Sequence, residues 1–158
     1  MRADLWSKML TNSVTVLGAV GGLLLGEVLA DAHRPLVREV LVEGAAVAAA
    51  SGVDLPTAFG APADLVGRRA PGWEMALDGA FDRAAERFGS VRSVTWRDFE
   101  LGRPTEIEAV TGEIVRRAGE LGVAAPANTA VLAALRSIEA GEQRPDPAHL
   151  RALVEAVA

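Results

Sequence analysis

Residues 105–121 read TEIEAVTGEIVRRAGEL, and this stretch decides the fold class. Its apolar side chains recur at the spacing of one helix face, and Gly122 follows as a stop. The apolar stripe consists of Ile107, Val110, Ile114, Val115, Ala118 and Leu121. Thr105 and Glu108 have the spacing of a capping box, in which each side chain bonds the backbone of the other residue. We therefore predict a helix from Thr105 to Leu121, capped by this pair.

The same helical period recurs along the whole chain. Further helices are predicted from about Ala3 to the glycines near Gly18, from Pro35 to Ser51, from Trp73 to Phe88, from an Asn128 cap to Gly141, and from Asp146-Pro147 onward. Val53 to Gly72 holds three prolines and three glycines and is predicted to be a loop with one helical turn. Neither a hairpin signal nor a strand pattern is found. We expect an all-α single domain of six to eight helices over residues 1–158.

Composition excludes several classes of function. Half of the 158 residues are hydrophobic, with seven aromatic residues among them, which favours a helical core of small side chains. The net charge of −5 and the lack of a basic run argue against nucleic acid. The absence of cysteine excludes disulfides and thiolate chemistry. Because His33 and His149 lie far apart, with no metal-binding spacing, no metal site is expected.

Lys8 is the only lysine, because 15 of the 16 basic residues are arginines. Arginine stays protonated at working pH, whereas a lysine can donate a proton in catalysis. Asn12 follows Lys8 by four residues, which places both side chains on one helix face. Lys8 is therefore a candidate proton donor, and the alternative is an ordinary surface ammonium group.

Three motifs in order carry a family resemblance. They are Trp6-Ser7-Lys8-Met9-Leu10-Thr11-Asn12, then Arg103-Pro104-Thr105-Glu106-Ile107, then Gly122-Val123-Ala124-Ala125-Pro126-Ala127-Asn128. Together with a long helix between the first two, they resemble the C-terminal domain of ketopantoate reductase (2-dehydropantoate 2-reductase). The resemblance runs from about Leu5 to about Glu139. It implies a helical domain like that of the 6-phosphogluconate-dehydrogenase-type reductases.

The resemblance implies a reaction and a set of site residues. Hydride from NADPH would reduce the keto carbon of a small 2-keto acid, as in the conversion of ketopantoate to pantoate in cytoplasmic pantothenate biosynthesis. Lys8 would protonate or hydrogen-bond the developing alkoxide, Asn12 would orient the substrate, and Glu106 would bind the substrate hydroxyl and hold Lys8. We expect the three side chains to converge in one cleft. The structural alternatives are an Asn12 that faces a neighbouring helix and a Glu106 that favours a helix N-terminus.

The sequence departs from the family where substrate specificity is expected. A second asparagine of the family falls at Val16, and a third falls at Leu25 or Gly26. The family's substrate-contacting serine falls at Val94, while Ser93 and Thr95 are expected to face elsewhere on their helix. We therefore list Val16, Ser93 and Val94 as substrate-binding positions and predict a lining that is more apolar than that of a pantoate site. This favours an altered substrate or a domain that has lost turnover.

No nucleotide-binding site is expected in this chain. The G-x-G-x-x-G fingerprint is absent, and no β-α-β unit is predicted. The resemblance therefore implies that the N-terminal Rossmann domain, which binds NADPH in the family, is absent here and is a separate or deleted partner. Whether the chain is an enzyme is left open, since it would be incomplete without that domain.

Two other classes of function stay open. One is a non-catalytic helical dimerisation or scaffold domain, and a homodimer is compatible with either reading. The other is a small secreted or membrane-anchored protein, because the 18 residues between Lys8 and Glu27 carry no charge. Gly18, Gly22 and Gly26 have the spacing of paired membrane helices. We favour their use in the close packing of a buried helix.

Overall fold

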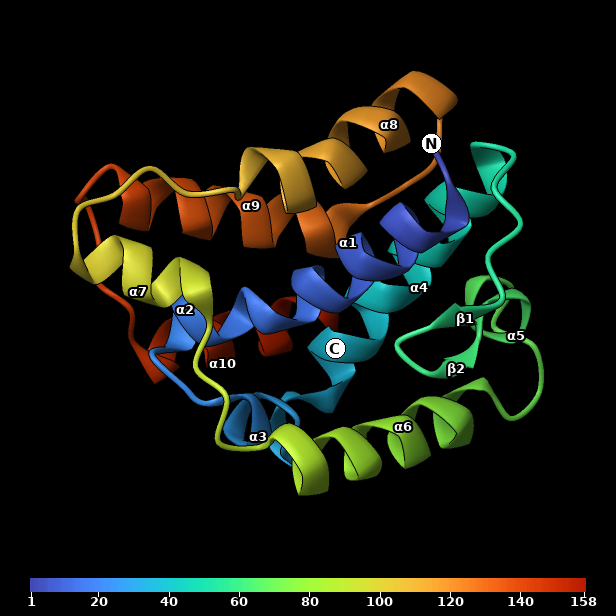
Figure 1. Cartoon of the computed structure of the whole chain (residues 1–158), viewed down its shortest axis with the longest axis horizontal. Helices are drawn as coiled ribbons and strands as arrows, with labels where there is room; N and C mark the ends of the chain where they lie inside the picture. Colours follow the sequence, from blue (N-terminus) through green and yellow to red (C-terminus); the bar gives the residue numbers. More distant parts are fainter.

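A computed structural model describes all 158 residues as a layered bundle of helices (Figure 1). A 3₁₀ turn, η1 (Asp31–His33), and a π-helical turn, η2 (Glu108–Gly112), interrupt the α-helices. The α-helices are α1 (Ala3–Thr15), α2 (Leu17–Gly21), α3 (Leu25–Val28), α4 (Arg34–Ala50), α5 (Ala63–Gly67), α6 (Trp73–Phe88), α7 (Val94–Glu100), α8 (Glu113–Leu121), α9 (Pro126–Glu139) and α10 (Pro147–Val157). The only strands are β1 (Thr57–Ala58) and β2 (Ala61–Pro62), paired antiparallel.

The all-α prediction is confirmed. Seven helices have seven residues or more, and all of them except α7 correspond to helices predicted from the sequence pattern, while α2, α3 and α5 are additional short turns of four or five residues. The segment predicted as loop holds α5, and it also holds the β1–β2 hairpin, which the sequence analysis missed. The prediction that the chain has no hairpin is therefore wrong. Strands of two residues are too short to show the alternation of apolar and polar side chains by which a strand is recognised.

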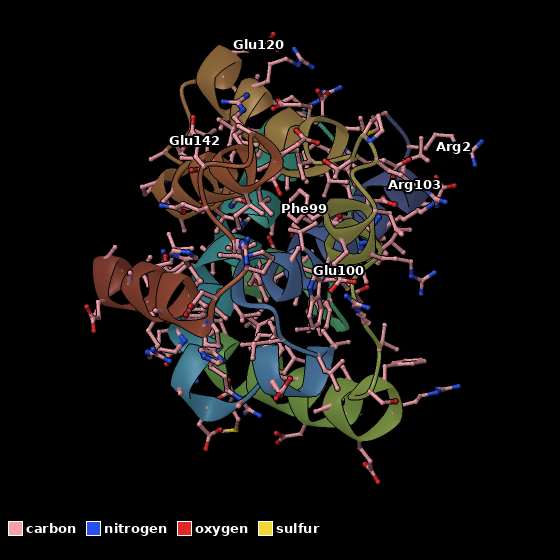
Figure 2. The ribbon with its side chains drawn as sticks, turned by 90° about the vertical axis from the view of Figure 1, so that its left-hand side faces the viewer. Arg2, Phe99, Glu100, Arg103, Glu120 and Glu142 are labelled. Carbon is pink, nitrogen blue, oxygen red and sulfur yellow. The ribbon has the colours of Figure 1, made fainter.

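Helix α4 occupies the centre of the bundle. It contacts α1, α5, α6, α8, α9 and α10, and its apolar side chains Leu36, Val37, Val40 and Leu41 are fully buried. In side view, α8 and α9 form one outer layer and α3 and α6 form the other, with α1, α2 and α4 between them (Figure 2). Burial of the apolar stripes against α4 is the main driving force for the fold.

The uncharged N-terminal segment forms three helices instead of one. Gly22 ends α2 with a φ of 64°, a left-handed conformation that glycine adopts readily. A Cβ on Gly18 would lie 2.6 Å from the carbonyl oxygen of Leu23, so the chain can turn back only over a glycine. The segment supplies Trp6, Leu10, Val14 and Leu17 to the core. None of the helices combines the length and apolar character that a bilayer crossing requires.

A buried carboxylate joins α4 to the start of α9. Glu43 is 5% exposed, and its oxygens accept hydrogen bonds from the backbone N–H groups of Ala127 (2.8 Å) and Asn128 (2.9 Å) and from the Asn128 side chain (2.8 Å). The prediction that Asn128 caps the helix is wrong, because α9 begins at Pro126 and Glu43 satisfies its free N–H groups. The Asn128 side chain also donates to the carbonyl of Val40 at 3.1 Å, which fixes α9 on α4.

Replacing Glu43 by glutamine should destabilise the protein. The NH2 group of Glu43→Gln would replace one of the two oxygens and so face a backbone N–H, a donor, of Ala127 or Asn128, and unfolding should become easier by about 1–3 kcal/mol. Urea unfolding followed by circular dichroism measures the change. Glu86→Gln on α6 is the matched control, because Glu86 is exposed and has no partner in the chain, so its effect should stay within about 0.5 kcal/mol. Equal unfolding midpoints for the two variants would contradict the role of Glu43.

A second carboxylate, Glu113, holds the first turn of α8 together. It accepts from Arg116 Nε (2.9 Å), Arg116 Nη2 (2.8 Å) and Arg117 Nε (2.6 Å). The Arg116 and Arg117 hydrogen bonds lower the pKa of Glu113 to about 2, against burial, which raises it. Arg117 also lies over the ring of Trp6 at 5.9 Å, so this cluster links α8 to α1.

Acid should weaken this link. The pKa of Glu113 is lowered in the folded state, so its contribution is present above the ordinary value of 4.5 and is lost as pH falls toward 2. The stability of the Glu113→Gln variant should therefore fall less steeply between these pH values than that of the parent. Glu155→Gln, which removes an exposed and unpaired carboxylate, should leave the parent slope unchanged in acid titrations of the unfolding midpoint.

Candidate functional site

A cleft of about 480 Å³ lies between α1, α7 and the loop that leads into η2. It contains every site residue that the sequence analysis selected, namely Lys8, Asn12, Val16, Ser93, Val94 and Glu106. The cleft is completed by Thr15, Thr95, Asp98, Pro104 and Val110. Residues almost a hundred positions apart in the sequence thus share one hollow.

Helix α1 presents three of these residues on one face. Lys8, Asn12 and Val16 follow one another at intervals of four, while Trp6, Leu10 and Val14 on the opposite side are fully buried. The buried side fixes the rotation of the helix about its axis. The exposed ammonium of Lys8 and the half-buried amide of Asn12 are therefore held toward the cleft.

Two ties to α9 position Glu106. The backbone N–H and the hydroxyl of Thr105 donate to Glu139 Oε1 at 3.1 and 2.5 Å, and the guanidinium of Arg136 donates to both oxygens of Glu108 at 2.6 and 2.8 Å. The predicted capping box is wrong, because Thr105 and Glu108 each bond α9 instead of each other's backbone. These bonds hold Glu106, which lies between them, at the rim of the cleft.

The predicted continuous helix from Thr105 is also interrupted. The N–H of Gly112 donates to the carbonyl of Ile107, five residues back, at 2.9 Å, which makes η2 a π-helical turn before α8 begins. Such turns arise where one extra residue enters a helix and often occur at functional sites. Here the wide turn places Val110 in the cleft together with Glu106.

Helix α7 supplies a more polar wall than the sequence predicted. Ser93 caps the helix by accepting from the N–H of Trp96 at 3.4 Å, and both Ser93 and Thr95 line the cleft, so the expectation that they face elsewhere is wrong. Val16, Val94 and Val110 supply the apolar part of the lining, and they stand among seven polar or charged side chains. Ser93 and Thr95 thus offer hydroxyl groups where Val94 offers none.

The polar side chains in the cleft are free to bind a ligand. Only five of the 21 acidic residues have neither a hydrogen bond nor an ion pair to the side chain, and they are Asp54, Glu86, Asp98, Glu106 and Glu155. Two of these five, Asp98 and Glu106, line the cleft. Lys8 and Asn12 also have no side-chain partner, and no direct hydrogen bond or ion pair joins Lys8 to Glu106. One cation and two carboxylates therefore face the cleft without internal neutralisation.

Thr15, Thr95 and Asp98 were not selected from the sequence. Asp98 ends the segment Ser93-Val94-Thr95-Trp96-Arg97-Asp98, which was compared with the family's serine motif. Its position four residues after Val94 could therefore have identified it as a cleft residue. Thr15 lies seven residues after Lys8, two helical turns along α1. Asp98 and Thr15 both face the cleft because neighbouring residues on their helices are buried, and this burial cannot be read from the sequence.

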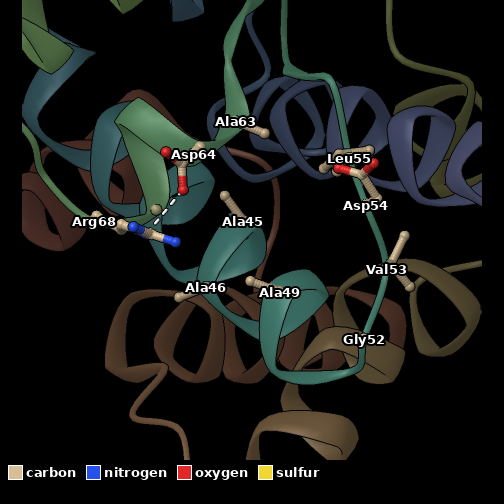
Figure 3. Close-up of a pocket in the computed structure, with 11 residues that line it drawn as sticks. Ala45, Ala46, Ala49, Gly52, Val53, Asp54, Leu55, Ala63, Asp64 and Arg68 are labelled. Carbon is tan, nitrogen blue, oxygen red and sulfur yellow. Dashed lines mark ion pairs between the residues drawn. The ribbon is translucent and has the colours of Figure 1, made fainter.

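A separate hollow of about 510 Å³ between α4 and α5 has less suitable chemistry (Figure 3). Its walls are mostly alanine and glycine, and Arg68 is paired with Asp64 at 2.8 Å. Asp54 is its one unpaired charge, and it lies across the hollow from that pair. The chain also contains no group of three or more residues that could hold a metal ion.

Comparison with known proteins identifies the family of this chain. Residues 1–139 match the family described as Ketopantoate reductase PanE/ApbA C terminal. The chain belongs to this family. Among its relatives are the 2-dehydropantoate 2-reductases of Archaeoglobus fulgidus, 27% identical over 139 residues, and Caulobacter vibrioides, 32% identical over 138 residues. These alignments cover 87% and 85% of this chain but 40% of each relative.

Solved structures of ketopantoate reductases have the same fold. The PanE/ApbA family enzyme of Ralstonia eutropha JMP134 superposes with a TM-score of 0.69 at 31% identity, over 90% of this chain and 42% of the other. A dimeric ketopantoate reductase of Staphylococcus aureus gives 0.67 at 22% identity, over 89% and 44%. The chain therefore spans less than half the length of the ketopantoate reductases that it matches.

Proposed function

We propose that this chain is the substrate-binding and proton-donating part of a 2-keto acid reductase, as its membership of the ketopantoate reductase family suggests. The observation that carries the proposal is the meeting of Lys8, Asn12 and Glu106 in one cleft with no partners inside the chain. Unpaired charges in a hollow are what a polar ligand needs, whereas surface charges elsewhere in this chain are mostly paired.

Each residue has a role that its chemistry supports. The ammonium of Lys8 would donate a hydrogen bond to the carbonyl oxygen and then a proton, as negative charge develops on that oxygen. Asn12, one turn further along α1, would orient the substrate. Glu106 would accept from a substrate hydroxyl or from Lys8, and the hydroxyls of Ser93 and Thr95 add donors beside Val94. Val16 would contact the apolar part of the acid.

The residues of this chain do not fit a dinucleotide. No glycine-rich turn follows a strand, and the only strands are two residues long. The hydride donor of the reaction, NADPH by resemblance, would therefore be held by a Rossmann domain outside residues 1–158. The role in pantothenate biosynthesis and the cytoplasmic location that the resemblance implies are part of this proposal.

Dimerisation is the second function that an observation favours. Val94, Leu101 and Leu5 are 67%, 56% and 51% exposed, and the Staphylococcus aureus relative is described as dimeric. Such side chains suit a protein interface. A non-catalytic scaffold would use this surface alone, so ligand binding at Lys8 discriminates between the two functions.

Binding of a 2-keto acid should move the signal of Lys8. Because Lys8 is the only lysine, protein made with isotope-labelled lysine gives one side-chain resonance by NMR. Addition of 2-oxobutanoate should shift this resonance saturably, and Asn12→Ala or Glu106→Gln should weaken binding about tenfold or more, as expected for hydrogen bonds to charged groups. Glu86→Gln is the control. A resonance that stays in place at high ligand concentration, in a chain that self-associates, would support the scaffold instead.

The isolated chain should bind NADPH weakly or not at all. The phosphate groups would find no cradle of backbone N–H groups, which a dinucleotide fold provides. Calorimetric titration of the 158-residue chain with NADPH measures this directly. A dissociation constant in the micromolar range would contradict the assignment of the cofactor to another domain.

A further inference from the structure

A second groove lies along α1 beside the cleft, and the two share Thr15 as a lining residue. The groove encloses about 530 Å³ between α1, the turn of the β1–β2 hairpin and α6. Thr15 lines both hollows, and in Figure 1 α1 lies between α6 and the loop that leads to η2. The two hollows, of similar size, are therefore neighbours separated by Thr15.

The floor and one side of the groove are apolar. Leu25, Phe59, Ala84, Phe88 and Val91 line it. Phe59 packs edge-on against the buried ring of Phe81, with 5.8 Å between the ring centres, and the backbone N–H of Leu25 donates to the carbonyl of Val91 at 3.0 Å. These contacts fix the wall in place, so the groove is formed before any ligand arrives and would take an alkyl or aromatic group.

Two arginines without acidic partners stand at the edge of the groove. Arg83 and Arg87 are four residues apart on α6, and neither forms an ion pair. Asp82 and Asp78 of α6 pair with Arg34 and Arg38 of α4 at 2.6 and 2.5 Å, and the exposed Glu86 of α6 forms no ion pair with either arginine. Arg87 instead lies over the ring of Phe88 at 5.3 Å. Two free guanidinium groups beside an apolar wall suit a ligand with an apolar body and an acidic end.

We propose that the substrate is a 2-keto acid with a long apolar substituent that ends in an acidic group. The keto acid head occupies the cleft at Lys8, the substituent passes Thr15 into the groove, and the acidic end meets Arg83 and Arg87. This inference rests on the proposed 2-keto acid reduction, and it assigns the chain a substrate other than the ketopantoate of pantothenate biosynthesis. It gives a physical reason for Val16 and Val94, because a substrate held along its apolar substituent depends less on polar groups at those two positions.

Calorimetric titration of the 158-residue chain with three acids tests the inference. The probes are 2-oxobutanoate, 2-oxooctanoate and 2-oxooctanedioate, which share the keto acid head. Burial of the added methylene groups should make 2-oxooctanoate bind at least about tenfold tighter than 2-oxobutanoate. The second carboxylate should add about another tenfold for 2-oxooctanedioate.

Variants locate the binding. Phe88→Ala should weaken both long acids and leave 2-oxobutanoate unchanged, whereas Arg83→Gln and Arg87→Gln should weaken only the diacid. Met75→Ala is the matched control, because Met75 lies on α6 outside the groove and is 79% exposed. Lys8→Met should weaken all three acids, because the head is common to them.

The outcomes separate this inference from the proposed function. Equal affinities for the three acids, all reduced by Lys8→Met, would overturn the inference and leave the proposed function standing. A diacid no tighter than 2-oxooctanoate would overturn the assignment of Arg83 and Arg87. Binding of none of the acids, or binding of the long acids that Lys8→Met does not change, would overturn both.

Discussion

The carboxylate of Glu43 is the contact on which the geometry of the site depends. It lies in the centre of the bundle on α4 and satisfies the N–H groups at the start of α9. Helix α9 in turn holds Thr105 through Glu139 and Glu108 through Arg136. Glu106 is thus positioned by a relay of three charged groups that begins in the core. Taking a carboxylate out of water is costly, and here the cost is offset because each bond reaches an otherwise unpaired donor.

The opposite wall of the cleft depends on packing alone. The buried side of α1 directs Lys8 and Asn12 toward the cleft. Helix α7 packs on α2, where a Cβ on Gly18 would stand at ordinary contact distance, 3.7 Å, from the Cβ of Ser93. One wall is therefore rigid through apolar contacts and the other through hydrogen bonds. Polar bonds near the surface open more readily than a packed core, so the loop that carries Glu106 is the more adjustable wall.

Most of the fold could be predicted from the sequence because the apolar stripes are long and regular. The cleft residues Lys8, Asn12 and Glu106 came from motif order, and Val16 and Val94 from departures from that order. The predictions of helix caps from local sequence patterns were wrong where a residue from another helix binds the capping side chain. Thr105 and Glu108 have the pattern of a capping box, but their side chains form hydrogen bonds with Glu139 and Arg136 instead of with each other's backbone. Asn128 has the pattern of a cap, but Glu43 and the carbonyl of Val40 bind it in the core. No short-range pattern contains such partners, which come from other helices.

The wide turn at η2 makes the site sensitive to chain length as well as to residue identity. One residue in an α-helix corresponds to about 100° of rotation about the axis, because a turn takes 3.6 residues. Deletion of a single residue between Glu108 and Gly112 would convert the wide turn to an ordinary α-helix, because the extra residue that the turn accommodates would be gone. The helix on either side would keep its register, but the residues inside the turn, Val110 among them, would present a different face to the cleft. The close approach of Glu108 to Gly112, where a Cβ would lie 2.7 Å from Oε2, is consistent with this register being held by a glycine. Alignments of the family should therefore weigh gaps in this turn as heavily as substitutions in the cleft.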